Sequence, residues 1–162
     1  MTNPDTDLPS QPVDEARRPI QRLLFVADAA VAEVDDLPPA VRVLLDAAAQ
    51  VFVLTPTLPG RLEWLADDVD AFRHVADERL DTVLGHVRSI GGHVTGQSGR
   101  GSVTLVIEDA VADFRPDHVL IAVCGPDHAN WQEHGLLAHV EERFGLPVTV
   151  YAVDSRGHAT RR

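Results

Sequence analysis

A glycine-rich segment, Gly96-Gln97-Ser98-Gly99-Arg100-Gly101-Ser102, holds residue types that could bind an anion. Glycine lets the backbone approach a phosphate closely, and Arg100 supplies a positive charge. Ser102 stands before a stretch with helical periodicity, and the N-terminus of a helix favours a negative charge. The candidate anion loop is therefore Gly99, Arg100, Gly101 and Ser102. Its spacing matches neither the P-loop nor the dinucleotide fingerprint, and a glycine-rich turn needs no ligand, so a plain turn is the favoured interpretation.

Histidines could supply metal ligands, and three of the eight in the chain, His128, His134 and His139, lie close together in sequence. His134 and His139 are five positions apart, which turns them away from a common helix face, unlike the i, i+4 pair of zinc enzymes. The chain has no Cys-x-x-Cys and no His-Glu-x-x-His. The sequence therefore favours solvated surface histidines and predicts no metal site.

Nucleophilic catalysis has little support in the sequence. No Gly-x-Ser-x-Gly elbow occurs. The single cysteine, Cys124, ends the apolar run HVLIAVC, which indicates a buried, inert thiol and a reducing cytoplasmic environment. We therefore expect no enzyme; unrecognised chemistry around Asp28 and His128 is the alternative that sequence leaves open.

The charge balance limits the partners of the chain. Its formal net charge is -11, and its arginines are dispersed among more numerous carboxylates. Nucleic acids and anionic membrane surfaces require clustered cations, so we expect neither as a partner.

Strand and helix signals alternate along the chain. Apolar runs of strand length alternate with stretches of three-to-four periodicity, and prolines or glycines mark their ends. The expected strands are Arg22–Asp28, Val51–Pro56, His93–Thr95, His118–Cys124 and Val148–Val153. The expected helices open at Pro38 and Pro39, run over Val69–Ile90, follow Ser102 as far as Phe114, and run from about Trp131 to Phe144.

Alternating strands and helices joined by right-handed crossovers predict a three-layer α/β/α sandwich with an all-parallel, five-stranded sheet. A ligand crevice is expected at the carboxyl end of His118–Cys124, because open parallel sheets bind ligands there. Residues 1–19 are polar and proline-rich, which is typical of a disordered leader, and residues 155–162 are expected to form a frayed polar tail. The domain itself is expected to span residues 20–154.

This layout resembles the universal stress protein family over nearly all of residues 20–154. The resemblance rests on RLLFVAD ending in Asp28, on the long helix before HVTG, and on the series ADFRPDHVLIAVCG to FGLPVTVYAV. It implies an adenine nucleotide alpha hydrolase-like sheet of order 3-2-1-4-5. It also implies an acidic residue near a ribose and a glycine that opens a phosphate loop, and Asp28 and Gly125 match these two positions.

The chain departs from the ATP-binding members of that family after Gly125. Those members resemble one another in a spaced glycine series that ends in Gly-Ser or Gly-Thr, whereas this chain continues Pro126-Asp127-His128-Ala129-Asn130. Pro126 contributes no N–H, and Asp127 and Glu133 add negative charge where a triphosphate would lie. The sequence therefore predicts weak or absent ATP binding and no cofactor.

Two functions follow as hypotheses. The favoured one is a non-enzymatic, universal-stress-like regulatory protein of the stress response that binds an unidentified protein partner or small ligand. It would form a homodimer through Val148–Val153, an apolar strand without the charged residues or prolines that prevent pairing at a sheet edge. The alternative is a sensor of AMP or ATP with a divergent phosphate loop, in which Asp28 holds a ribose and Gly125, His128 and Asn130 contact phosphate or base.

Overall fold

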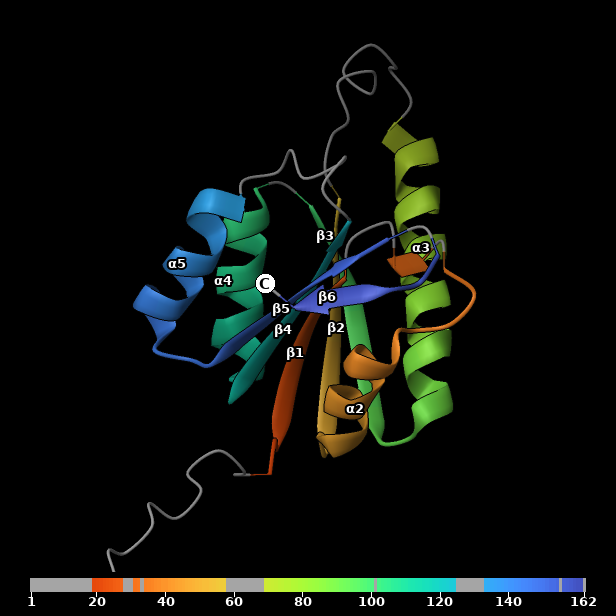
Figure 1. The fold of residues 1–162 in the computed structure, drawn as a ribbon. Helices are drawn as coiled ribbons and strands as arrows, with labels where there is room; N and C mark the ends of the chain where they lie inside the picture. Colours follow the sequence, from red (N-terminus) through yellow and green to blue (C-terminus); the bar gives the residue numbers. More distant parts are fainter. Residues whose placement is uncertain are drawn as a thin grey trace, which may run out of the picture.

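The chain folds into one open sheet with helices on both of its faces, as the computed structural model in Figure 1 shows. The structure describes residues 19–27, 31–32, 34–57, 69–100, 102–124, 133–154 and 156–161. The strands are β1 (Arg22–Ala27), β2 (Gln50–Thr57), β3 (His93–Arg100), β4 (His118–Cys124), β5 (Val148–Val153) and β6 (Ala159–Arg161). The helices are α2 (Pro39–Ala47), α3 (Val69–Ile90), α4 (Val103–Phe114) and α5 (Glu133–Phe144).

The sheet order is β3-β2-β1-β4-β5-β6. All neighbours from β3 to β5 pair in parallel, and β6 pairs with β5 in the antiparallel direction. The predicted three-layer α/β/α class and the order 3-2-1-4-5 are confirmed. The expectation that the sheet would be all parallel and five-stranded is corrected by the sixth strand.

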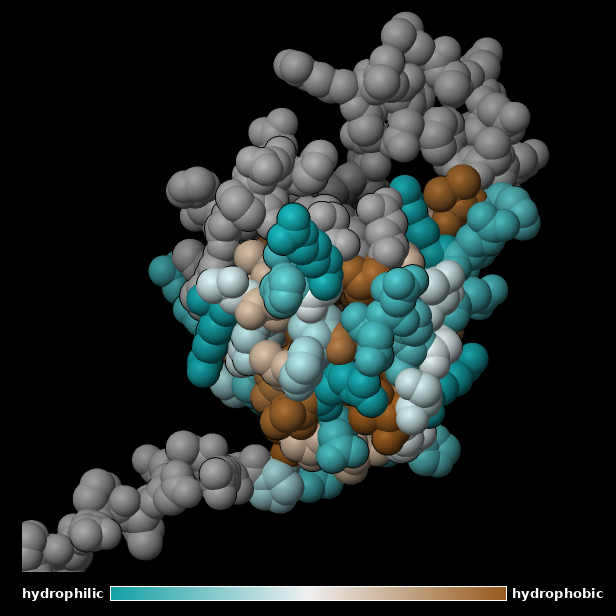
Figure 2. Space-filling model, turned by 45° about the vertical axis from the view of Figure 1, so that its right-hand side comes forward, coloured by the Kyte–Doolittle hydropathy of each residue, from teal (hydrophilic) through white to brown (hydrophobic). Residues whose placement is uncertain are grey.

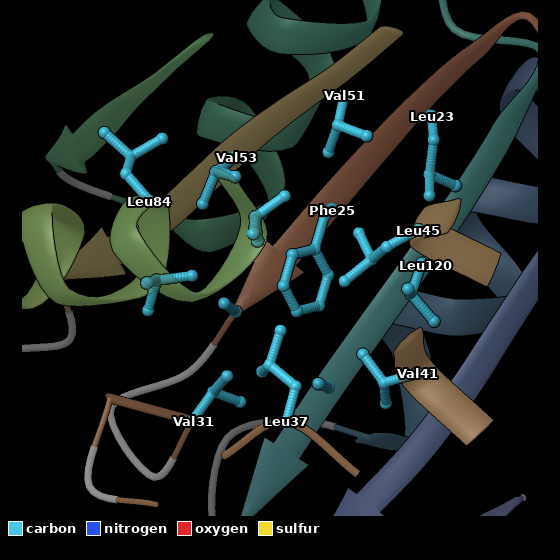
Figure 3. Close-up of a cluster of buried hydrophobic side chains, with 14 of the residues drawn as sticks. Leu23, Phe25, Val31, Leu37, Val41, Leu45, Val51, Val53, Leu84 and Leu120 are labelled. Atoms are coloured by element: carbon cyan, nitrogen blue, oxygen red, sulfur yellow. The ribbon is translucent and has the colours of Figure 1, made fainter. Parts of the chain in front are cut away.

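The central strand β1 is buried on both faces, which accounts for the two helical layers. Leu23 to Ala27 of β1 are all buried, and their side chains alternate between two separate hydrophobic clusters. One cluster lies between the sheet and α2 and α3, and Figure 3 shows Phe25 at its centre beside Leu45, Val53 and Leu120. The other lies between the sheet and α4 and α5. A strand buried on both faces reads as a continuous apolar run, which is the pattern that the sequence displayed.

Proline, glycine and serine stand at the helix ends where the sequence predicted them. Pro38 occupies the N-cap position of α2 and Pro39 is its first residue, where the missing N–H costs nothing. After α3, Gly91 and Gly92 take φ values of 110° and 91°, a conformation that favours glycine. Ser102 is the N-cap residue of α4, as predicted, although its side chain makes no capping hydrogen bond.

β3 is longer than the sequence indicated. The expected strand ends at Thr95, whereas β3 continues through Gly96 and Gly99 to Arg100, although glycine is unfavourable inside a strand. A Cβ on Gly96 would lie 2.7 Å from the carbonyl oxygen of Val53, and a Cβ on Gly99 would collide with Cγ1 of Val106 on α4. These glycines therefore let the neighbouring backbone and α4 approach β3 closely, which outweighs their low strand propensity.

β6 was missed because its three residues, Ala-Thr-Arg, show no apolar alternation. The polar composition of residues 155–162 predicted a frayed tail, whereas the structure pairs Tyr151 with Arg161, Ala152 with Thr160 and Val153 with Ala159. Tertiary pairing, rather than intrinsic propensity, forms this strand. β5 is consequently not an open edge along its whole length.

Asp117 joins the amino ends of β1 and β4. Its Oδ2 accepts a hydrogen bond from the backbone N–H of Gln21 at 2.8 Å, and its Oδ1 accepts one from that of Arg22 at 3.1 Å. The N–H of Asp117 in turn donates to the carbonyl of Arg22 at 2.9 Å. These bonds set the register in which Leu23 lies opposite His118.

Polar residues cover most of the face in Figure 2, where hydrophobic residues form small, separate patches. Among the helices that the structure describes, none combines the length and the apolar character that crossing a bilayer requires.

The close approach of β3 and α4 predicts opposite effects of one substitution at two sites. Gly99→Ala should lower the free energy of unfolding by about 1–3 kcal/mol, because the added methyl overpacks against Val106. Gly85→Ala on α3, where a Cβ would meet nothing within 4 Å, should raise it by about 0.5–1 kcal/mol. Urea unfolding of both variants tests this, and equal effects at the two positions would contradict the packing role of Gly99.

Candidate functional site

The carboxyl ends of β1 and β4 form the switch point of the sheet. β1 and β4 are neighbours, with Ala27 opposite Ala122. From β1 the chain proceeds through β2 to β3 on one side, and then returns to β4 on the other side. α2 and α3 cover one face and α4 and α5 the other, as Figure 1 shows. Ligands of open α/β sheets bind where the strand order reverses in this way.

The nucleotide candidates stand next to this switch point in sequence. Asp28 directly follows Ala27, the last residue of β1, and Gly125 directly follows Cys124, the last residue of β4. Asp28, Gly125, His128 and Asn130 themselves lie outside the described residues. The fold thus brings together the two strand ends that carry them, and their roles remain predictions.

The candidate anion loop does not form one loop. Gly99 and Arg100 end β3, Ser102 caps α4, and Gly101 lies outside the described residues. β2 separates β3 from β1, which puts the end of β3 about 10 Å from the switch point at a strand spacing of about 4.8 Å. Contact with Val106 gives Gly99 a packing reason to be glycine, and strand β3 continues to Arg100 where the sequence indicated a turn.

A buried hydroxyl near the carboxyl end of β2 escaped the sequence analysis. Thr55 is 6% exposed, and its Oγ1 has no hydrogen-bond partner among the described residues. Its register neighbour on β3 is Ser98, whose Oγ donates to Oδ1 of Asp77 on α3 at 3.1 Å. A buried hydroxyl without a partner is unfavourable, so Thr55 is an unsatisfied polar group near the carboxyl end of β2. The sequence signal was a threonine within the apolar run VFVLTP.

A cavity of about 410 Å³ lies on the α2 face, between the segment that follows β1 and the turn between β5 and β6. It is lined by Val34, Asp35, Asp36, Leu37, Pro38, Pro39, Arg42, Arg156 and Gly157. Nη1 of Arg42 lies 2.7 Å from Oδ2 of Asp36, whose Oδ1 accepts the N–H of Leu37 at 3.0 Å. The lining offers charges of both signs, which does not favour a ligand as strongly anionic as a triphosphate.

Asp154 builds the turn that forms one wall of this cavity. Its Oδ1 accepts the backbone N–H groups of Arg156 and His158, both at 2.9 Å, and its Oδ2 lies 3.2 Å from Nδ1 of His158. Gly157 takes a φ of 77° in this turn. The N–H of His158 is the largest cause that lowers the pKa of the Asp154 carboxyl; desolvation opposes it, and the N–H of Arg156 and the ring of His158 lower the pKa further. Asp at the first position and Gly at the fourth position of a turn, as in Asp154 and Gly157, is a signal that could have revealed this turn from the sequence.

His139 belongs to a surface cluster between α4 and α5. Its Nε2 lies 2.8 Å from Oε1 of Glu108, which also accepts Nε of Arg143 at 3.2 Å. The hydrogen bond from His139 is the main cause that lowers the pKa of Glu108. Within the described part of the chain, no group of three or more histidine, cysteine or acidic residues could hold a metal ion.

Comparison with known proteins identifies the fold. No protein-family model and no curated protein matches the sequence. Among solved structures, a protein of the universal stress protein family from Burkholderia pseudomallei is similar, with a TM-score of 0.52 and 19% identity over 79% of this chain and 93% of that one. A universal stress protein from Archaeoglobus fulgidus has a TM-score of 0.50 and 17% identity over 81% of this chain and 93% of its own.

A third solved structure is a universal stress protein in complex with cAMP, with a TM-score of 0.50 and 13% identity over 83% of this chain and 98% of that one. These likenesses show that the chain has the fold of universal stress proteins, which confirms the fold that the resemblance implied.

The hydrogen bonds to Asp154 predict an acid-sensitive turn. Because the folded-state pKa of Asp154 is lowered, its contribution to stability is present above the ordinary aspartate pKa of about 3.9 and is lost as pH falls through the lowered value. Asp154→Asn should therefore lower Tm at neutral pH. The difference in Tm between this variant and the wild type should become smaller in acid. Thermal melts across this range test the prediction, with Asp46→Asn on α2 as the matched control. A difference that does not change with pH would contradict it.

Proposed function

We propose that this chain is a universal-stress-like regulatory protein that works by binding a small ligand or a protein partner, not by catalysis, and that binds ATP weakly or not at all. The proposal rests on the switch point between β1 and β4, together with the residues that follow these two strands in the sequence. The fold supplies the place where a nucleotide would bind. The segment Gly125-Pro126-Asp127 lacks what a triphosphate needs there, because proline has no N–H and aspartate repels phosphate.

The titratable groups with clearly shifted pKa values lie apart from one another in the described part of the chain. In the described part of the chain, three groups have clearly shifted pKa values: Glu108 on α4, His118 at the start of β4 and Asp154 after β5. Burial lowers the pKa of His118, whose Nε2 lies 2.9 Å from Oγ1 of Thr149. These three groups lie on separate parts of the fold, so they do not mark a shared catalytic cleft.

A nucleotide sensor is the second candidate. It is favoured by the solved structure of similar fold that contains cAMP. In this version Asp28 holds a ribose, and Gly125, His128 and Asn130 contact phosphate or base. A monophosphate such as AMP suits Asp127 better than ATP does, because it brings less negative charge to the loop.

The proposal includes a homodimer in the cytoplasm. Val148 to Val150 of β5 have no outer pairing partner among the described strands, and an unpaired apolar edge favours strand addition by a second copy. The lone Cys124 is compatible with a reducing compartment, and the net charge of -11 disfavours nucleic acid as a partner.

Calorimetric titration and thermal shift with ATP, AMP and cAMP test the proposal. A specific ligand at 100 times its Kd should stabilise the native state by about 2.7 kcal/mol. We expect no such stabilisation by ATP, and a micromolar affinity for ATP would overturn the proposal. Binding of AMP or cAMP that Asp28→Ala abolishes, and that Asp46→Ala on α2 leaves intact, would favour the sensor.

The loop at the end of β3 has its own test. Because Gly99 is explained by packing and both β2 and β1 lie between β3 and β4, Arg100→Glu should leave the affinity for any ligand found in that screen unchanged. A tenfold or greater loss of affinity, equal to about 1.4 kcal/mol, would instead assign Arg100 to a binding site.

A further inference from the structure

The outer edge of β5 is covered over only half of its length. β5 reads Val-Thr-Val-Tyr-Ala-Val, and four of these six residues are buried. β6 pairs with Tyr151, Ala152 and Val153, whereas Val148 to Val150 pair with β4 alone in the described part of the chain. An apolar edge with free N–H and C=O groups is a template for another strand.

β6 has the properties of a protective edge rather than of a core strand. It has three residues, and Thr160 and Arg161 are exposed. Ala159 alone packs against the hydrophobic cluster beneath α2 and α3, and β6 also contacts α2. Short length and a charged side chain are the devices by which natural sheets prevent edge-to-edge pairing.

The turn around Asp154 holds β6 in place. The N–H of Asp154 donates to the carbonyl of His158 at 3.0 Å, and the Asp154 side chain accepts two backbone N–H groups of the turn. Asp154 and His158 therefore form a hydrogen-bonded pair. Antiparallel pairs alternate, which makes Ala152 opposite Thr160 the next hydrogen-bonded pair. Few residues and mostly exposed hydrogen bonds hold this strand, so its opening requires little free energy.

We propose that β6 is a displaceable guard on β5. When β6 is seated, it prevents a second copy of the chain from adding to β5 along its full length. When β6 is displaced, all of Val148–Val153 becomes available for pairing with that second copy. This inference rests on the proposed dimer through β5 and assigns its regulation to the C-terminal residues.

Full-length Thr160→Pro, with Thr160→Ala as its matched control, tests the guard. Proline removes the N–H of Thr160 that the strand alternation directs to Ala152, whereas alanine keeps it. Sedimentation equilibrium should give a dimer Kd for Thr160→Pro that is lower than those of the control and the wild type by roughly tenfold or more. Asp154→Ala, which removes the acceptor of the turn, should act in the same direction and provides a second variant should the proline variant fold poorly.

Hydrogen exchange locates the interface in the same samples. We expect protection in the variant dimer of the amides of Val148, Val150 and Ala152, which the strand alternation directs to the outer edge of β5, and protection elsewhere would overturn the guard. Equal dimer Kd values for all variants would overturn the guard while leaving the dimer in place. Monomers throughout would overturn both the guard and the β5 dimer, whereas the ligand titrations would still decide the binding function.

Discussion

Burial of β1 and β4 on both faces is the constraint on which the rest of the structure depends. Five consecutive residues of each strand, Leu23–Ala27 and Val119–Val123, are buried. Such strands need helices on both sides, so α2 and α3 must cover one face and α4 and α5 the other. Since crossovers between parallel strands are right-handed, a chain that moves to the other face must also reverse the direction in which it adds strands. That reversal falls between β1 and β4, and the Asp117 bonds to Gln21 and Arg22 hold the two strands together at their amino ends.

The reversal creates a place for a ligand without determining which ligand binds. Connections leave β1 and β4 toward opposite faces, which opens the sheet at their carboxyl ends. The chemistry at that opening comes from the residues that follow, and these are Asp28 after β1 and Gly125, Pro126 and Asp127 after β4. A likeness to a cAMP-bound protein at 13% identity therefore shows the fold and not the ligand. The architecture alone therefore does not determine the function.

Features that local periodicity encodes were predictable, and features that distant segments create together were not. The apolar runs and the three-to-four spacing of α3 and α4 predicted strands, helices and their ends at Gly91 and Ser102. The extension of β3 depends on the close approach of Val53 to Gly96 and of Val106 to Gly99. The sequence of β3 alone does not reveal these contacts. β6 depends on a turn built by Asp154, and the cavity depends on that turn meeting residues 34–42. For the site, the sequence identified the two strand ends, and their meeting in the fold is confirmed, whereas Thr55 stood out only once its burial was known.

The two edges of the sheet are managed by different means. On β3, exposed polar residues such as Thr95 and Gln97 alternate with glycines, so this edge offers a partner little apolar surface. The apolar residues of β5 pack into both hydrophobic clusters, one beneath α4 and α5 and the other beneath α2 and α3. Polar residues in their place would remove buried apolar contacts from the core. A separate polar strand, β6, resolves this conflict because it covers part of β5 and presents Thr160 and Arg161 in its place. Arg156 and Gly157 of the turn that holds β6 also line the cavity, so a displacement of this turn changes the cavity wall and the exposed edge of β5 together.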